Sequence, residues 1–111
     1  MLSVAKLRSL ALELPEVEEK PSHGVPTFRV AGKLFAALRE ELDSVAIKLD
    51  FDARDSLIEG DPEVFYTNDH YRNYPMVLVR LNKIPIALLR ELLRDAWSRA
   101  APRRLTKSAM E

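Results

Sequence analysis

Three consecutive short segments in the first half of the chain alternate apolar and polar residues with a period of two. They read VPTFRV (25–30), KLFAALR (33–39) and VAIKLDF (45–51), separated by Ala31-Gly32 and by the polar run 40–44. A period of two is typical of strands that bury one face. Connections this short join antiparallel neighbours, because parallel pairing needs a long crossover. We therefore expect an antiparallel sheet.

Segments with helical spacing flank these strands. The stretch SVAKLRSLALEL (3–14) has one apolar stripe and stops before Pro15, and a long amphipathic helix is expected between Pro85 and Pro102. The remaining expected elements are a short helix at ARDSLIE (53–59), strands at VFY (64–66) and MVLVRL (76–81), and an additional candidate strand at EEKPS (18–22).

The expected order is α-β-β-β-α-β-β-α. Strands that are apolar on one side imply a sheet with one covered face, and the amphipathic helices supply the cover. The predicted fold class is α+β: a two-layer sandwich whose antiparallel sheet is covered on one face by the N- and C-terminal helices. A length of 111 residues fits a single domain, 1–111. Residues 103–111 are expected to be a flexible basic tail.

Composition excludes several classes of function. There is no cysteine, so a disulfide framework, a thiolate zinc site and a cysteine nucleophile are excluded. Residues 1–79 carry 9 basic and 14 acidic groups (−5), and residues 80–111 carry 8 and 3 (+5), so a net charge of zero conceals a basic last third. Charges at Lys6 and Arg8 interrupt any signal-peptide core, and no apolar run approaches the ~20 residues of a membrane span. We expect a cytoplasmic monomer that has no membrane partner.

The stretches EEKPSHGVPTFRVAGKLFA (18–36), DPEVFYTNDHYRNYPMVLVRL (61–81) and AWSRAAPRRL (96–105) together resemble the MmcQ/YjbR-like proteins. The resemblance implies a small α+β domain similar to the frataxin/CyaY fold, in a family whose members are commonly labelled DNA-binding. It carries over no catalytic residues. The family's recurring positions fall on His23, Pro26, Phe28, Gly32, Lys33, Phe35, His70, Tyr71 and Arg80.

The strand registers predict a basic face. The residues expected to face the helices are Phe28, Leu34, Leu38, Ile47 and Val79. The cations then expected on the opposite face are Arg29, Lys33, Arg39, Lys48 and Arg80, with Phe35 and Leu78 among them. Phosphates would meet these charges, and bases would stack on Phe35 and Tyr71, as in sequence-tolerant nucleic-acid binding. The alternative is an ordinary solvated sheet face.

The aromatic stretch FYTNDHYRNYP (65–75) predicts a structured loop between two strands. Its length exceeds a two-residue turn, and its asparagines and aspartate supply turn chemistry. Either the tyrosine rings cap one end of the core, or the loop borders a groove that binds a protein or a small molecule. The candidate groove residues are His23, His70, Tyr71 and Tyr74.

The two histidines, His23 and His70, are not spaced as a local i, i+4 metal pair, and no third imidazole exists to complete a zinc site. No nucleophile-elbow motif and no glycine-rich phosphate loop is present. We expect no catalytic residues, no metal and no cofactor. The sequence predicts a non-enzymatic binding domain with DNA as partner, and a protein or a small molecule in the groove is the alternative.

Overall fold

A computed structural model of the protein describes residues 2–109, with side chains through residue 107. The helices are α1 (Val4–Leu12), α2 (Phe51–Gly60), α3 (Ile86–Ala100) and α4 (Arg103–Ala109), and a 3-10 turn, η1, covers Glu40–Leu42. The strands are β1 (Val17–Ser22), β2 (Val25–Val30), β3 (Lys33–Arg39), β4 (Ser44–Lys48), β5 (Phe65–Tyr66) and β6 (Met76–Arg80).

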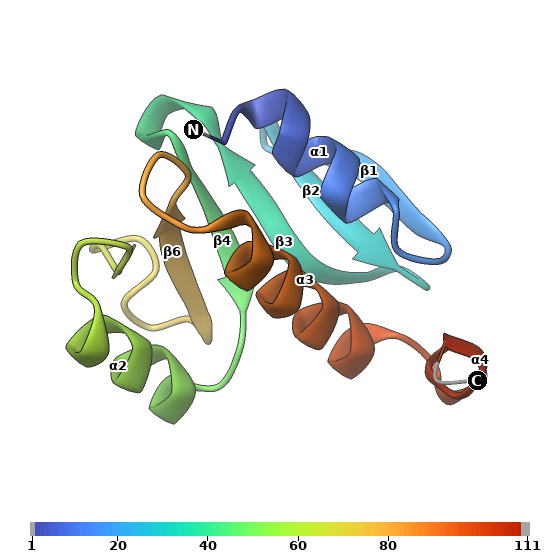
Figure 1. The fold of residues 1–111 in the computed structure, drawn as a ribbon. Helices are drawn as coiled ribbons and strands as arrows, with labels where there is room; N and C mark the ends of the chain where they lie inside the picture. The colour runs from blue at the N-terminus through green and yellow to red at the C-terminus, as the bar shows by residue number, and fades with distance from the viewer. Residues whose placement is uncertain (1, 110–111) are drawn as a thin grey trace.

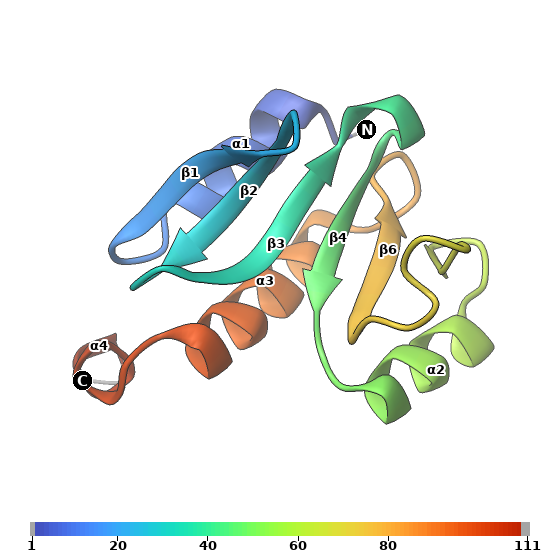
Figure 2. The ribbon, with the colours of Figure 1, turned by 180° about the vertical axis from the view of Figure 1, so that it is seen from behind.

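The strands form one sheet in the order β1-β2-β3-β4-β6-β5, and every neighbouring pair is antiparallel. Helices α1 and α3 lie on one face of this sheet, and α2 lies beside its β6 end (Figure 1). The view from behind shows the other face of the sheet in front of these helices (Figure 2). The predicted α+β sandwich is confirmed, and the candidate strand at 18–22 is present as β1.

Local sequence explains where several of these elements begin and turn. The hydroxyl of Ser3 caps α1 by accepting a hydrogen bond of 3.1 Å from the amide of Lys6. The hairpins β1–β2 and β2–β3 turn at His23-Gly24 and Ala31-Gly32, where both residues of each turn have positive φ. Two positive φ values are the signature of the type I′ turn, whose twist matches that of the paired strands.

The main core lies between the sheet and its two covering helices. Phe28, Leu38, Ile47 and Val79 are all at most 1% exposed there, as the alternation predicts. Leu89, Leu93 and Trp97 of α3 pack against them from the helix layer. The indole N–H of Trp97 donates to the carbonyl oxygen of Pro15 at 3.0 Å, which joins the last helix to the end of the first.

The predicted orientation of β3 is wrong over its first half. The pairing with β2 shifts by one residue between Phe28 and Arg29, so that Phe35 is the extra residue of a β-bulge. Arg29 pairs with Leu34, which therefore lies on the face away from the helices. Phe35 is fully buried in the helix-side core instead of standing exposed among cations. Lys33 pairs with Val30, and so belongs to the helix side as well.

The predicted flexible tail is also wrong over residues 103–109, which form α4. Leu105 is only 8% exposed and packs against the main core. Arg104 makes a two-pronged ion pair with Glu16 at 3.0 and 3.2 Å. This contact raises the pKa of Arg104 and lowers that of Glu16. Residues 110 and 111 of the predicted tail lie outside the described residues.

None of the helices within residues 2–109 combines the length and the apolar composition that crossing a membrane requires.

A second, smaller apolar cluster lies on the sheet face away from α1 and α3. Its buried members are Ala37, Ala46, Tyr71, Met76 and Leu78. Leu78 was expected to point away from the helices and does so, but the loop that carries Tyr71 covers it completely. This face is therefore partly covered by the chain itself.

Candidate functional site: a groove between the first hairpin and the aromatic loop

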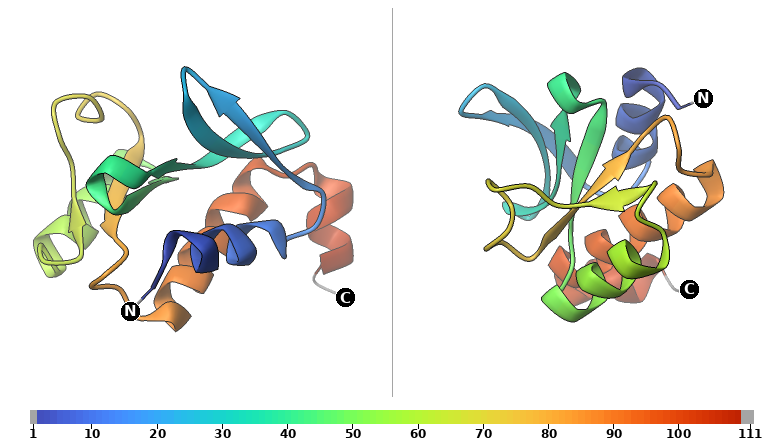
Figure 3. Two further views of the ribbon diagram at one scale, coloured as in Figure 1. Left: turned by 90° about the horizontal axis from the view of Figure 1, so that it is seen from above. Right: turned by 90° about the vertical axis from the view of Figure 1, so that its left-hand side faces the viewer.

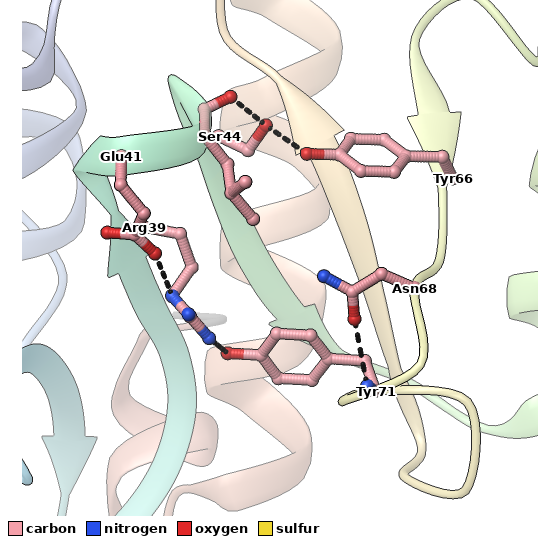
Figure 4. A network of polar contacts seen from close by, with 7 residues as sticks. Arg39, Glu41, Ser44, Tyr66, Asn68 and Tyr71 are labelled. Carbon is pink, nitrogen blue, oxygen red and sulfur yellow. Dashed lines mark hydrogen bonds and ion pairs between the residues drawn. The ribbon is translucent and has the colours of Figure 1, made fainter.

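Residues 67–75, here called the aromatic loop, connect β5 to β6 and fold over the sheet face away from the helices. The side-chain oxygen of Asn68 accepts from the amide of Tyr71 at 3.0 Å, which closes a tight turn at the start of the loop (Figure 4). The amide of Tyr74 donates to the carbonyl of Tyr71 at 2.9 Å. The carbonyl of Pro75 accepts from Leu49 at 3.0 Å, which ties the loop's end to the chain after β4.

The side chain of Arg54, in α2, binds the backbone of the aromatic loop. Its side chain is buried, and one terminal nitrogen, Nη1, donates to the carbonyls of Arg72 at 2.9 Å and Tyr74 at 3.2 Å, with that of Tyr71 at 3.5 Å. Its Nε pairs with Asp55 at 3.0 Å. Because backbone carbonyls turned into a protein need partners, one buried guanidinium fixes the shape of the loop.

Tyr71 anchors the loop to the sheet. Its ring is 6% exposed, and its hydroxyl accepts a 2.8 Å hydrogen bond from Nη1 of Arg39 (Figure 4). Nε of Arg39 pairs with Glu41 at 2.6 Å. The hydroxyl of Tyr71 and the carboxylate of Glu41 raise the pKa of Arg39. The predicted alternative in which Tyr71 packs on the core is therefore present, but on the second cluster rather than at an end of the main core.

Next to this contact, the hydroxyls of Ser44 and Tyr66 form a hydrogen bond of 2.6 Å (Figure 4). The guanidinium of Arg80 lies over the ring of Tyr66, 4.0 Å from its centroid, and donates to the carbonyls of Pro62 and Glu63 at 3.2 Å each. Arg80 therefore stabilises the edge strand β5 and the turn that leads into it.

A groove of about 450 Å³ lies between the first hairpin and the aromatic loop. Seen from above, the β1–β2 hairpin and the loop after β5 both rise from the sheet face opposite the helices (Figure 3, left). The first hairpin, the aromatic loop and the strands between them contribute the lining residues of the groove: Ser22, His23, Val25, Thr27, Leu34, Ala37, Arg39, His70, Tyr71, Tyr74 and Met76. All four predicted groove residues are among them.

The rim of the groove is aromatic and exposed. The ring of His70 meets the ring of Tyr71 edge-on at 4.6 Å and lies 6.0 Å from that of Tyr74. Tyr74 is 54% exposed, so its ring does not cap the core as one sequence interpretation had it. His23 stands on the opposite wall, in the hairpin turn, with a φ of 51°. None of the described residues that line this groove is acidic.

The predicted basic face does not form as one surface. Arg39 and Arg80 are engaged with the contacts described above, and Arg29 bonds Thr27 at 3.2 Å and the carbonyl of Gly32 at 3.4 Å. Phe35, the predicted stacking ring, is buried. Lys33 and Lys48 are exposed, and both line a different hollow, beside α3. The arginines therefore act in this structure as internal donors.

Within residues 2–109, no three histidine, aspartate or glutamate side chains gather in a way that could hold a metal ion. His23 and His70 share the groove, and none of its described lining residues is a carboxylate. The groove offers hydrogen-bond donors, aromatic rings and an apolar floor, and these groups are suited to binding a ligand.

The model of the YjbR family matches residues 12–99, four fifths of the chain, including both hairpins, the aromatic loop and most of α3. The chain belongs to the YjbR family. This confirms the resemblance read from residues 18–36 and 61–81.

Two relatives of this chain are the uncharacterized proteins Mb2600 of Mycobacterium bovis and Rv2570 of Mycobacterium tuberculosis, each 42% identical over 53 residues. The match spans 48% of this chain and 41% of theirs, so it covers about two fifths of those relatives' length. The crystal structure of Deinococcus radiodurans protein DR2400, a DUF419 domain, has a TM-score of 0.78 at 24% identity and covers 97% of this chain and 88% of that one. This likeness establishes the fold alone.

Sequence reasoning missed Arg54, which decides the shape of the YjbR domain's aromatic loop. A signal for it exists: Arg54 stands three and four residues before Leu57 and Ile58, and therefore on the apolar stripe of its helix. An arginine at such a position is buried together with the apolar residues of the stripe. A buried charge needs hydrogen-bond partners, so the position predicts bonds inside the protein.

Proposed function

We propose that this YjbR-family domain is a non-enzymatic binding module whose groove takes a small molecule with a planar aromatic body and an acidic group. The observation that carries the proposal is the convergence of His23, His70, Tyr71 and Tyr74 on one groove. The proposal includes a cytoplasmic monomer that needs no cofactor, as the cysteine-free composition favours a reducing compartment.

The size and the lining of the groove support a small ligand. Its volume of about 450 Å³ falls within the range of roughly 300–1,000 Å³ that is usual for small-molecule sites. Val25, Leu34, Ala37 and Met76 supply an apolar floor. The exposed rings of His70 and Tyr74 offer faces on which a planar group stacks.

The polar groups of the groove support the acidic part of the ligand. Its ionisable nitrogen groups belong to His23, His70 and Arg39, and none of the described lining residues is a carboxylate. Glu41, outside the lining, pairs with Nε of Arg39. A carboxylate that enters the groove meets donors of hydrogen bonds and finds no like charge among the lining residues. A cationic ligand finds no ionic partner among the described lining residues.

The test is a calorimetric or NMR titration with indole-3-acetate, naphthalene-2-carboxylate and 4-hydroxyphenylacetate, each beside its uncharged amide. Ligands of about 13 heavy atoms at about −0.3 kcal/mol each reach about −4 kcal/mol, a Kd near 1 mM. We expect at least one acid to saturate at or below this concentration and its amide to bind more weakly.

The exposed ring of Tyr74 gives the matched variant. Tyr74→Ala removes a rim aromatic without touching the core and should abolish saturation, whereas Ile86→Ala, at another exposed apolar side chain outside the groove, should leave it unchanged. Equal binding by acids and amides would refute the acidic group. No saturation by any of the acids up to about 10 mM, ten times the expected Kd, would refute the proposal, and binding of a protein partner that Tyr74→Ala abolishes would assign the groove to a macromolecule.

A further inference from the structure

A second hollow lies outside the groove, where the sheet meets the last turn of α3. It measures about 670 Å³ and is lined by Lys33, Lys48 and Arg99 together with Asp50 and four apolar residues. None of its lining residues belongs to the groove beside the aromatic loop. The hollow is therefore lined separately from the groove, and comes close to it at Pro75, between the groove residues Tyr74 and Met76.

Three segments that are distant in sequence bring these cations together. Lys33 opens β3, Lys48 closes β4, and Arg99 stands in the last turn of α3. The bulge at Phe35 is what sends Lys33 to this place, because it pairs Lys33 with Val30 on the helix side of the sheet. Without that extra residue, Lys33 would lie on the opposite face.

The charges in this hollow are mostly uncompensated. Lys33 and Lys48 are exposed and make no ion pair with any side chain that the structure describes. Arg99 pairs with Asp95 at 3.1 Å and comes within 4.0 Å of Asp50. The carboxylate of Asp50 is also engaged as the cap of α2, where it accepts from the amide of Ala53 at 2.7 Å.

We infer that the hollow lined by Lys33, Lys48 and Arg99 binds a phosphate group. A phosphate has several oxygens spread around one centre, so it can meet two ammonium groups and one guanidinium that approach from different elements. Lysine binds phosphate as a point charge, and arginine adds a planar fork of donors. A carboxylate has one charge and two oxygens, so it matches three cations less well than a phosphate does.

The experiment titrates pyrophosphate into the protein at low salt and follows backbone amide shifts by NMR. We expect saturable shifts at Lys33, Lys48 and the last turn of α3, with the groove residues unaffected. Two unit charges about 4 Å apart in water correspond to about a fivefold change in affinity, so Lys33→Ala with Lys48→Ala should weaken binding about 25-fold. Arginine at both positions should restore most of it.

The charge-matched control is Lys6→Ala with Lys83→Ala, which removes two exposed lysines that border a separate hollow without an arginine. This control should bind pyrophosphate as the unaltered protein does. Equal weakening in both double variants would overturn the inference, because it would show only the effect of net charge. Absence of saturable shifts at low salt would overturn it too.

Two sources of phosphate are separated by further probes, ATP and a 12-base single-stranded DNA. If the ligand is a free nucleotide, ATP binds at least as tightly as pyrophosphate and the DNA does not compete. If the ligand is a nucleic-acid backbone, the DNA competes, with a log–log salt slope near −2 for three contacts. Loss of either binding in the Lys33, Lys48 double variant supports the phosphate site, and its persistence contradicts it.

Discussion

Arg54 is the residue on which the shape of the aromatic loop depends most. Its Nη1 carries two hydrogens and faces three carbonyls, so two good hydrogen bonds form, to Arg72 at 2.9 Å and Tyr74 at 3.2 Å, and the 3.5 Å contact to Tyr71 is the weakest. Hydrogen bonds to a charged group contribute about 1.5–3 kcal/mol each. Arg54→Ala removes both of them and leaves the carbonyls facing a vacated space.

Two such bonds together contribute about 3–6 kcal/mol. We expect Arg54→Ala to lower the free energy of unfolding by about 3–4 kcal/mol, the lower part of this range, because water enters the vacated space and rebinds some carbonyls. At about 4 °C or more per kcal/mol, the melting temperature should fall by at least about 12 °C. Arg54→Lys keeps the charge but offers a point donor in place of the fork, and should cost about half as much.

The assay is chemical denaturation together with amide hydrogen exchange. Exchange in Arg54→Ala should accelerate most at Tyr71, Tyr74 and Met76 and least in the β2–β3 hairpin. Arg94→Ala is the control, since Arg94 is an exposed helical arginine with no ion pair among the described residues, and it should change stability by less than about 0.5 kcal/mol. A loss below about 1 kcal/mol in Arg54→Ala, with unchanged exchange in the loop, would refute this reasoning.

Three further predictions concern the two hairpin turns, the hydroxyl of Tyr71 and the carboxylate of Glu41. His23→Asn and Ala31→Asn, each at the first positive-φ position of a type I′ turn, should both stabilise the fold by about 0.5–1 kcal/mol in denaturation experiments, but only His23→Asn should weaken ligand binding; a loss of stability in both would contradict the turn assignment. Tyr71→Phe removes the bond to Arg39 and should cost about 1–2 kcal/mol in the same assay, and an unchanged midpoint would show that the bond contributes nothing. A hydrogen bond from its own backbone amide and the Arg39 guanidinium lower the pKa of Glu41, so its stabilisation is full above the ordinary carboxyl pKa of 4.5 and is lost as pH falls below it; acid unfolding of Glu41→Gln should be less steep there than that of the unaltered protein, and identical curves would count against the pair.

The fold could be predicted because each of its signals is local. Period-two segments with two-residue connections admit only antiparallel neighbours, and the amphipathic stripe of α3 shows which face it buries. Even the strand at 18–22, largely exposed at the sheet edge, follows from the His23-Gly24 turn that pairs it with β2.

The orientation of β3 could not be predicted, because it depends on one bulged residue. KLFAALR is apolar at five consecutive positions, Leu34 to Leu38, so its pattern is compatible with either face until the partner strand fixes the register. The bulge buries Phe35 and moves Lys33 to the helix side, which divides the predicted basic face.

The candidate site could be predicted only in its aromatic part. Composition alone drew attention to residues 65–75, and the groove residues His23, His70, Tyr71 and Tyr74 do come together. The hydrogen bond from Arg39 to Tyr71 joins residues 32 positions apart, and the bonds from Arg54 to the aromatic loop join residues at least 17 positions apart. A pattern within one segment contains no information about such partners. For the same reason α4 was missed: its stability comes from Leu105 and from the ion pair with Glu16.

The most direct test of the central claim is an amide NMR map of the protein saturated with the tightest aromatic acid of the set. We expect the largest shifts on both walls of the groove, at His23 in the hairpin turn and at His70, Tyr71 and Tyr74 in the aromatic loop. The amides of Lys33 and Lys48 should not shift. Shifts confined to one wall, or centred on α3 and the end of β4, would contradict the central claim.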